Sequence, residues 1–332
     1  MEIQKMWEMH RERVLGGCAL TLIFFASAAF TWSSFTDASR SARVGDGVDS
    51  TGVATILPAA EVAAAAVSTE LAPDVFASAA IAAKSAIIID VTENKVLYAL
   101  NPDTQLPLAS LTKVPLVLVV TQVLPLDTII TITEGVFPFA TGAQWKLSDI
   151  IDYTLAISSN QGADILAAEA EVSIREQYKD APAYGATLWR MNELARELDL
   201  DHTYFLNATG LDEGPTQSGA YGTARDMATL FAYAAATSPD TFSATRVQSF
   251  TIQSLGGARA TAINTDAALP AIPGLLVGKT GYTTLAGGNL AVVYEEGGRR
   301  IVAVVLGSTQ TGRFEDMKAL ITLTNQTIAA NR

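Results

Sequence analysis

Strand-like runs occur at both ends of the folded part of this chain with helical patterns between them, and this constrains the fold more than any other feature. The runs Ser85 to Asp90 (SAIIID) and Lys95 to Leu100 (KVLYAL) are separated by a short turn. Three further runs, at 275–279, 289–295 and 299–307, are joined by glycine-containing turns. We predict that the two ends of the chain meet in an antiparallel sheet of about five strands.

Helical patterns occupy the middle of the chain and its last residues. The stretch from Tyr184 to Leu198 carries its apolar residues on one helical face. The other predicted helices cover 147–157, 162–169, 226–234 and 314–330. We therefore expect an α+β fold with helices on both faces of the sheet and an all-helical region inserted between its strands.

An uncharged, largely apolar run of 19 residues, from Val14 to Trp32, precedes the folded part. At about 1.5 Å per residue, a helix of this length just crosses a hydrocarbon core of about 30 Å. Ala26-Ser27-Ala28 has the small-residue pattern of a signal-peptide cleavage site. Residues 14–32 are thus predicted to be a retained membrane anchor or a cleaved signal peptide, and either one exports the rest of the chain.

The remaining sequence divides into three parts. Residues 1–13 form an N-terminal tail before the apolar run. Residues 33–75 are rich in Ala, Ser, Asp and Gly and show neither strand alternation nor a long amphipathic stripe, so we interpret them as a linker. Residues 76–332 are expected to form one folded domain, which is long enough to bury a core.

The scarce residue types limit the chemistry of this chain. The single cysteine, Cys18, excludes an internal disulfide and a thiolate metal cluster. Of the two histidines, His10 lies in the tail, and no Gly-x-Ser-x-Gly motif accompanies His202. With 34 acidic and 22 basic residues the net charge is −12, which argues against a nucleic-acid partner. A nucleophilic serine here needs a base other than histidine.

The first candidate motif is Ser110-Leu111-Thr112-Lys113, which an apolar run follows. If a helix begins at Ser110, Lys113 lies one turn away on the same face. Helix-terminal N–H groups favour negative charge that develops on the serine. Burial or a nearby cation would lower the pKa of the lysine, which could then accept the hydroxyl proton. The alternative is a helix-capping serine beside a solvated lysine.

The second motif, Ser158-Ser159-Asn160, lies in a break between two predicted helices. A hydroxyl and an amide on such a bend can both point into a cleft. The serine would then pass a proton to a leaving amine, and the asparagine would bind a substrate amide. The alternative is a cap that joins consecutive helices.

The third motif, Lys279-Thr280-Gly281, stands at the end of the strand-like run 275–279. The lysine and hydroxyl can hold a carboxylate, and the glycine lets another backbone approach closely. The alternative is a hairpin turn with a solvent-facing lysine. A phosphate-binding loop at 274–280 is excluded because three residues separate its glycines where that loop has four.

The three motifs occur along the chain in the order Ser-x-x-Lys, Ser-x-Asn, Lys-Thr-Gly. In this order of motifs the sequence resembles the penicillin-recognising serine enzymes. Among these it is most similar to the D-alanyl-D-alanine carboxypeptidases, the peptidase S11-type members of the low-molecular-mass penicillin-binding proteins. The resemblance covers about residues 80–330. Segments similar to the family lie at 83–87, 97–98, 107–113, 190–192, 203–212, 223–228 and 279–287. It implies a penicillin-binding transpeptidase-like, or β-lactamase-like, fold for the catalytic domain 76–332.

The resemblance also implies a role for each matching residue. Ser110 would form an acyl-enzyme with the penultimate D-alanine of a peptidoglycan stem pentapeptide and release the last D-alanine. Lys113 would be the general base, and Ser158 would assist proton delivery. The substrate-binding residues would be Asn160, Lys279, Thr280, Gly281, Tyr282 and Arg313.

The resemblance also implies which part of the substrate several of these residues contact. Asn160 would bind the substrate amide, and Thr280 would contact the terminal carboxylate. The backbone N–H groups of Ser110 and Tyr282 would form the oxyanion hole. Arg313 falls where related enzymes place an arginine near the substrate carboxylate, and the alternative is a solvated residue that opens the last helix.

Related functions use the same residues. A D,D-endopeptidase or a non-turning-over β-lactam sensor remains open, and so does a β-lactamase, although residues 193–197 lack the Glu-x-x-Leu-Asn pattern of a deacylating loop. The resemblance implies peptidoglycan stem peptides as substrates and β-lactams as inhibitors. It also implies a place in the bacterial cell envelope, membrane contact through the N-terminal segment, and no metal or other cofactor.

Overall fold

A computed structural model of the protein describes residues 75–330. The predicted tail, the apolar run 14–32 and the linker up to residue 74 lie outside the described residues, so their assignments stay predictions. Within the described part, no helix combines the length and the apolar character that a membrane crossing requires.

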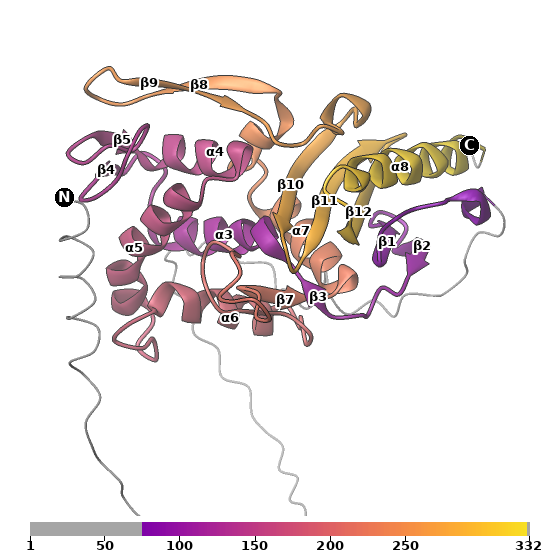
Figure 1. Ribbon diagram of the computed structural model, residues 1–332, viewed down its shortest axis with the longest axis horizontal. Coiled ribbons are helices and arrows are strands. Elements are labelled where there is room, and N and C mark those ends of the chain that lie inside the picture. Colours follow the sequence, from indigo (N-terminus) through magenta and orange to yellow (C-terminus); the bar gives the residue numbers. More distant parts are fainter. Residues whose placement is uncertain (1–74, 331–332) are drawn as a thin grey trace, which may run out of the picture. The chain divides into compact units, whose positions relative to one another are not determined.

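A five-stranded antiparallel sheet joins the two ends of the described chain (Figure 1). Along β1, the pairing with β12 runs from Ser85 opposite Leu306 to Asp90 opposite Ile301. The predicted sheet is therefore confirmed. The strand order is β10 (Leu275–Thr283), β11 (Gly287–Glu296), β12 (Arg299–Ser308), β1 (Ser85–Asp90) and β2 (Lys95–Leu100).

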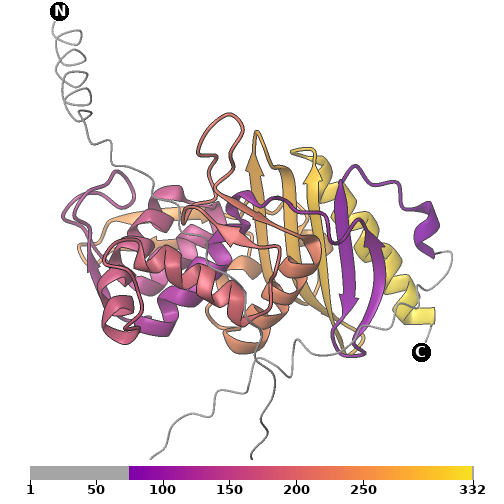
Figure 2. The ribbon, with the colours of Figure 1, turned by 90° about the horizontal axis from the view of Figure 1, so that it is seen from below.

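Both faces of the sheet are covered by helices, as predicted. Successive side chains along β12 belong to different apolar cores: Val304 lies on the side of α7 (Ala224–Thr237), and Val305 lies on the side of α8 (Gly312–Ala330). Figure 2 shows α8 running along the strands. Because neither face meets water, the strands are apolar on both sides, which is why they appear in the sequence as nearly continuous apolar runs.

The inserted helical region is built around one central helix. Residues 113–120 of α3 (Lys113–Val123) are all buried, because α3 contacts three other helices of the region. Those helices are α4 (Leu147–Ile157), α5 (Asn160–Gln177) and α6 (Ala186–Glu197). The predicted helices are confirmed, although α5 is longer than the predicted 162–169. Its extra turns carry a mixture of polar and apolar residues, which weakens the periodic signal.

Three small sheets were not expected from the sequence. In Figure 1 the β8–β9 hairpin crosses above α4. Most of these strands are two or three residues long, which is too short for an alternation pattern to be detected. The small sheets comprise β4 (Ile129–Thr131) with β5 (Gln144–Lys146), β8 (Ser249–Gln253) with β9 (Arg259–Ile263), and β3 (Leu106–Pro107), β7 (Ala220–Gly222) and β6 (Tyr204–Phe205).

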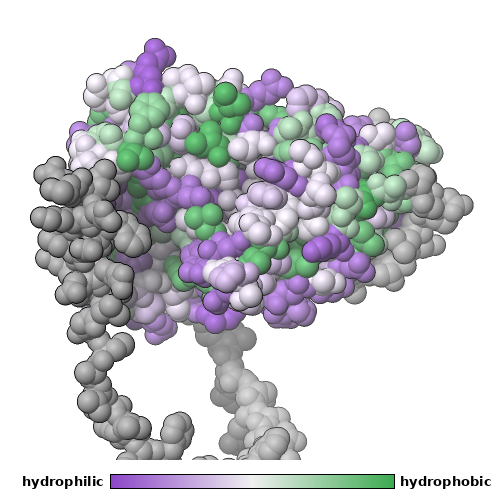
Figure 3. All heavy atoms as spheres, viewed as in Figure 1, coloured by the Kyte–Doolittle hydropathy of each residue, from purple (hydrophilic) through white to green (hydrophobic). Residues whose placement is uncertain are grey.

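Short 3-10 helices complete the described chain. They are η1 (Val75–Ser78), η2 (Ala109–Thr112), η3 (Ser243–Arg246) and η4 (Leu269–Ala271). The surface mixes hydrophilic and hydrophobic residues on the face shown in Figure 3, so hydropathy alone does not mark an interaction site there.

The start of α5 depends on a side-chain cap. Ser159 Oγ accepts a hydrogen bond from the Gly162 N–H at 3.0 Å. Replacing Ser159 by alanine removes this acceptor, so we expect Ser159→Ala to lower the free energy of unfolding by about 1 kcal/mol. Urea denaturation measures this loss. The control is Ser173→Ala in the interior of the same helix, where alanine is the better helix former. Equal losses in the two variants would contradict the capping role.

Candidate active site

Ser110 lies in a tight turn that leads into the central helix. The turn η2 is a 3-10 helix and α3 begins at Lys113, so the predicted helix start at Ser110 is corrected to a 3-10 turn. Ala109, the first residue of η2, directly precedes Ser110. Its φ is +49°, a left-handed conformation that costs a non-glycine residue on the order of 1 kcal/mol. Even so, Lys113 Nζ lies 2.8 Å from Ser110 Oγ, as the predicted one-turn spacing requires.

Lys113 is fully buried, and its amine meets three acceptors. Nζ lies 2.8 Å from Ser110 Oγ, 2.8 Å from Asn160 Oδ1 and 2.7 Å from the Thr209 carbonyl oxygen. Burial lowers the pKa of Lys113 to about 7, and the negative charge of Asp164 opposes this shift. An uncharged amine can donate to two of these acceptors and accept the proton of the Ser110 hydroxyl.

The bend between α4 and α5 carries the second motif. Ser158 ends α4 in a left-handed conformation with φ of 63° and ψ of 40°. Its Oγ accepts a hydrogen bond of 2.9 Å from Lys279 Nζ. Ser159 caps α5, so Asn160 is the first residue of that helix and reaches Lys113. The bend is therefore both a helix cap and a part of the site.

The third motif lies within β10, not at the end of a strand. The strand continues to Thr283, which pairs with Gly287, and it forms one edge of the five-stranded sheet. A Cβ at Gly281 would lie 2.9 Å from the Leu108 carbonyl oxygen and 3.2 Å from the Ser110 nitrogen. Only glycine allows β10 to pack this closely against the turn that carries Ser110.

Lys279 brings a second amine into the same region. It is 1% exposed, and its Nζ also donates to the Thr280 carbonyl oxygen at 2.8 Å. Burial lowers the pKa of Lys279, and the positive charges of Lys113 and Arg313 lower it further, while Asp266 opposes them. The site thus disfavours three simultaneous positive charges. Because Lys279 is buried, the alternative of a hairpin turn with a solvent-facing lysine is wrong.

Arg313 is also buried, which corrects the alternative of a solvated residue at the start of the last helix. Its Nη1 donates to the Gly281 carbonyl oxygen at 2.9 Å. Its guanidinium lies 5.9 Å from the ring centroid of Tyr282, which is 46% exposed, and 4.6 Å from that of Phe314. These contacts hold the cation against the strand that carries the third motif.

The sequence motifs did not identify several residues around the site. The Thr209 carbonyl binds Lys113, and Thr265 Oγ1 lies 2.6 Å from Thr280 Oγ1. Asp266 and Asp164 act electrostatically on the buried cations. None of the three motifs contains these residues, although Thr209 lies in the family-like segment 203–212, and a carbonyl contact carries no side-chain signal. Only the tertiary structure could reveal them.

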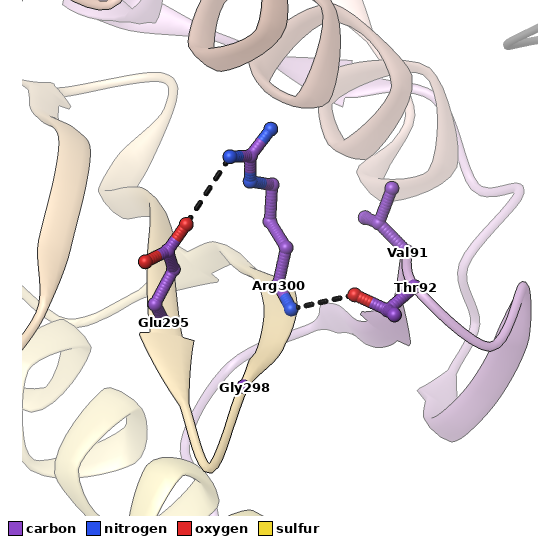
Figure 4. Close-up of a pocket in the computed structure, with 5 residues that line it drawn as sticks. All are labelled: Val91, Thr92, Glu295, Gly298 and Arg300. Atoms are coloured by element: carbon purple, nitrogen blue, oxygen red, sulfur yellow. Dashed lines mark hydrogen bonds and ion pairs between the residues drawn. The ribbon is translucent and has the colours of Figure 1, made fainter.

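A separate pocket of about 240 Å³ lies at the turns of the sheet and contains none of these residues. Figure 4 shows that an ion pair spans part of it, with Arg300 Nη2 3.1 Å from Glu295 Oε1. The lining residues are Val91, Thr92, Glu295, Gly298 and Arg300. In residues 75–330, no three His, Cys, Asp or Glu side chains gather where they could hold a metal ion.

A five-stranded sheet with an inserted helical region, a serine–lysine pair and a lysine-bearing edge strand defines the class of penicillin-recognising serine enzymes. The sequence profile of the peptidase S11 family, described as D-alanyl-D-alanine carboxypeptidase, matches residues 69–310. The chain belongs to this family.

Individual relatives agree with this assignment. The chain is 30% identical over 250 residues to the D-alanyl-D-alanine carboxypeptidase DacC of Escherichia coli, a match that spans 72% of this chain and 60% of DacC. A D-alanyl-D-alanine carboxypeptidase structure from Mycobacterium tuberculosis superposes with a TM-score of 0.62 at 27% identity, over 73% of this chain and 90% of the other. Ampicillin-bound penicillin-binding protein D2 from Listeria monocytogenes gives 0.61 at 25% identity, over 74% and 98%. The expected fold is thereby confirmed.

Gly281 offers a direct test of how closely β10 must approach Ser110. In Gly281→Ala the new Cβ would meet backbone atoms at 2.9 and 3.2 Å, so the strand must move away from the turn. We expect at least about tenfold slower labelling of Ser110 by a fluorescent penicillin. Gly214→Ala is the control, because no atom lies within 4 Å of its added Cβ. Wild-type labelling rates in Gly281→Ala would show that this close approach is not required.

Proposed function

We propose that the protein is a serine-type D-alanyl-D-alanine carboxypeptidase that removes the terminal D-alanine from peptidoglycan stem pentapeptides. The observation that carries this proposal is the 2.8 Å contact between Lys113 Nζ and Ser110 Oγ, with a buried amine whose pKa is about 7. A serine hydroxyl is a weak nucleophile unless an adjacent base takes its proton. Membership of the family supports the substrate class.

The proposed acylation begins when Ser110 Oγ attacks the carbonyl carbon of the penultimate D-alanine and Lys113 takes the hydroxyl proton. The backbone N–H groups of Ser110 and Tyr282 stabilise the oxyanion. The bond to the terminal D-alanine then breaks. Ser158, which Lys279 holds, gives its proton to the leaving amine and receives the proton that Lys113 took from Ser110, so Lys113 is uncharged again. Water next hydrolyses the ester and regenerates the Ser110 hydroxyl.

The remaining site residues bind the substrate in this proposal. Asn160 contacts the amide that precedes the penultimate D-alanine. The terminal carboxylate meets Thr280, with Arg313 nearby as a positive charge. The absence of a side chain at Gly281 lets β10 lie close against the turn of Ser110. β-Lactams are proposed inhibitors because their strained amide acylates the same serine.

The proposed place of action is the bacterial cell envelope. Residues 14–32 hold the protein at the membrane if they are retained and direct export if they are cleaved. Residues 33–75 then link this segment to the catalytic domain at 76–332. The uncharged length of the apolar run supports the proposal.

A paired assay tests the proposed function. We expect the enzyme to release D-alanine from diacetyl-Lys-D-Ala-D-Ala and to be labelled by a fluorescent penicillin, and Ser110→Ala to abolish both, because Ser110 supplies the nucleophile. Ser173→Ala, in the interior of α5, is the control.

Three outcomes would contradict the carboxypeptidase. Rapid penicillin turnover without release of D-alanine indicates a β-lactamase. Stable acylation of the protein, without hydrolysis of penicillin and without release of D-alanine, indicates a sensor. Cleavage of cross-linked peptides alone indicates an endopeptidase.

The pH dependence of acylation tests the role of Lys113. Because the amine accepts a proton only when it is uncharged, we expect the acylation rate to rise with pH through a midpoint near 7. Lys113→Arg is expected to lose acylation across the neutral range, because a guanidinium does not lose its proton there. Stopped-flow labelling with a fluorescent penicillin measures both effects. A flat profile across the neutral range would remove Lys113 from the role of base.

A further inference from the structure

The segment 207–213 contacts two parts of the candidate active site. The Thr209 carbonyl oxygen accepts a hydrogen bond of 2.7 Å from Lys113 Nζ. At the next residue, Gly210, an added Cβ would lie 2.0 Å from the Ala109 carbonyl oxygen. The backbone of this segment therefore packs directly against η2, the turn that carries the nucleophile.

The Asn207 side chain makes this segment rigid from within. Its Oδ1 accepts hydrogen bonds from the Gly210 N–H at 2.7 Å and from the Thr209 N–H at 3.2 Å. Its Nδ2 donates to the Leu211 carbonyl oxygen at 3.0 Å and to the Glu213 carboxylate. A segment held in this way suits the support of a site, because it resists small displacements of the groups attached to it.

Asp212 joins this segment to the end of β10. Its Oδ1 accepts a hydrogen bond of 2.9 Å from Thr283 Oγ1, and its Oδ2 accepts one of 3.2 Å from the Leu285 N–H. Thr283 is the last residue of β10, and its Oγ1 also accepts a hydrogen bond of 3.1 Å from the Ala286 N–H. The two oxygens of one carboxylate thus hold both the strand end and the turn that leads to β11.

The strand end that Asp212 holds lies one residue beyond Tyr282. The proposed function assigns the Tyr282 N–H to the oxyanion hole, so the place of this donor relative to Ser110 decides how well the developing charge is stabilised. In the five-stranded sheet β10 is an edge strand that pairs with β11 alone. A displacement of about 1 Å at such a donor can slow a reaction about a hundredfold, so support from outside the sheet matters here.

We propose, on the basis of the proposed function, that Asp212 is a positioning residue, which holds the Tyr282 N–H at a fixed place relative to Ser110 and Lys113. A carboxylate is an acceptor with two oxygens, and each oxygen of Asp212 meets one donor. Hydrogen bonds to a charged acceptor are stronger than neutral ones, which suits the fastening of a strand end by one side chain.

The experiment measures kcat and KM for release of D-alanine from diacetyl-Lys-D-Ala-D-Ala. Asp212→Ala is expected to lower kcat about tenfold and to leave KM nearly unchanged, because the oxyanion forms only in the transition state. Asp212→Asn replaces charge-assisted hydrogen bonds by neutral ones, so a smaller loss in kcat is expected. The control is Asp201→Ala, which removes an exposed carboxylate before the segment and is expected to keep the wild-type kcat.

A transition-state analogue separates positioning from a general structural effect. N-acetyl-D-boroalanine forms a tetrahedral adduct on Ser110 that places an oxygen in the oxyanion hole. Its inhibition constant is therefore expected to rise about tenfold in Asp212→Ala, in step with the loss of kcat. A purely structural role would instead reduce the fraction of protein that a fluorescent penicillin labels, while kcat per labelled site and the inhibition constant stayed at wild-type values.

Thr283→Val tests the partner of Asp212, because it removes the hydroxyl that donates to the carboxylate. We expect it to lower kcat as well. Combined with Asp212→Ala, it is expected to lower kcat by less than the product of the two single effects, because both side chains act through one hydrogen bond. Single effects that simply multiply would contradict the proposed coupling.

The outcomes distinguish the positioning role from the proposed function. If the wild-type enzyme is labelled by penicillin but releases no D-alanine, the proposed function fails, and the inhibition constants still decide the role of Asp212. If D-alanine is released but Asp212→Ala keeps the wild-type kcat and inhibition constant, the positioning role is wrong and the proposed function stands. A wild-type enzyme that is neither labelled nor inhibited contradicts both.

Discussion

Burial of the Lys113 amine is the interaction on which the rest of the site depends. A charged ammonium without water is costly, so the protein surrounds this amine with acceptors and lowers its pKa toward neutrality. The acceptors come from three separate segments, which contribute Ser110, Asn160 and Thr209. One nitrogen therefore fixes how η2, the start of α5 and the loop at residue 209 meet around α3.

Backbone strain supports this arrangement on both sides of the nucleophile. Ala109 and Ser158 both adopt left-handed conformations that non-glycine residues rarely take. Such conformations persist only where the surrounding contacts hold them, and here the contacts are those of β10 and the buried lysines. These conformations cost local stability, and they direct the hydroxyl groups of Ser110 and Ser158 toward the amines of Lys113 and Lys279.

The charges of the site are divided between its interior and its rim. Lys113, Lys279 and Arg313 are buried within mutual electrostatic reach, with Asp266 as a nearby opposing charge. Asp164 lies nearer the surface, where partial burial raises the pKa of its carboxyl and the charge of Lys113 opposes that shift. The buried amine of Lys113, whose pKa is lowered to about 7, suits proton transfer.

The local sequence pattern determined the main strands and the family of this protein. Continuous apolar runs predicted the strands at 85–90 and 95–100, because a strand buried on both faces needs apolar residues throughout, and the order of three short motifs identified the family. The sequence did not reveal that the strand continues beyond Lys279 to Thr283, that Arg313 is buried, or that the small hairpins exist. Burial of an isolated charge and the pairing of short strands are set by distant neighbours, and only the tertiary structure brings these together. The contacts of Asp212 with the end of β10 are decided in the same way.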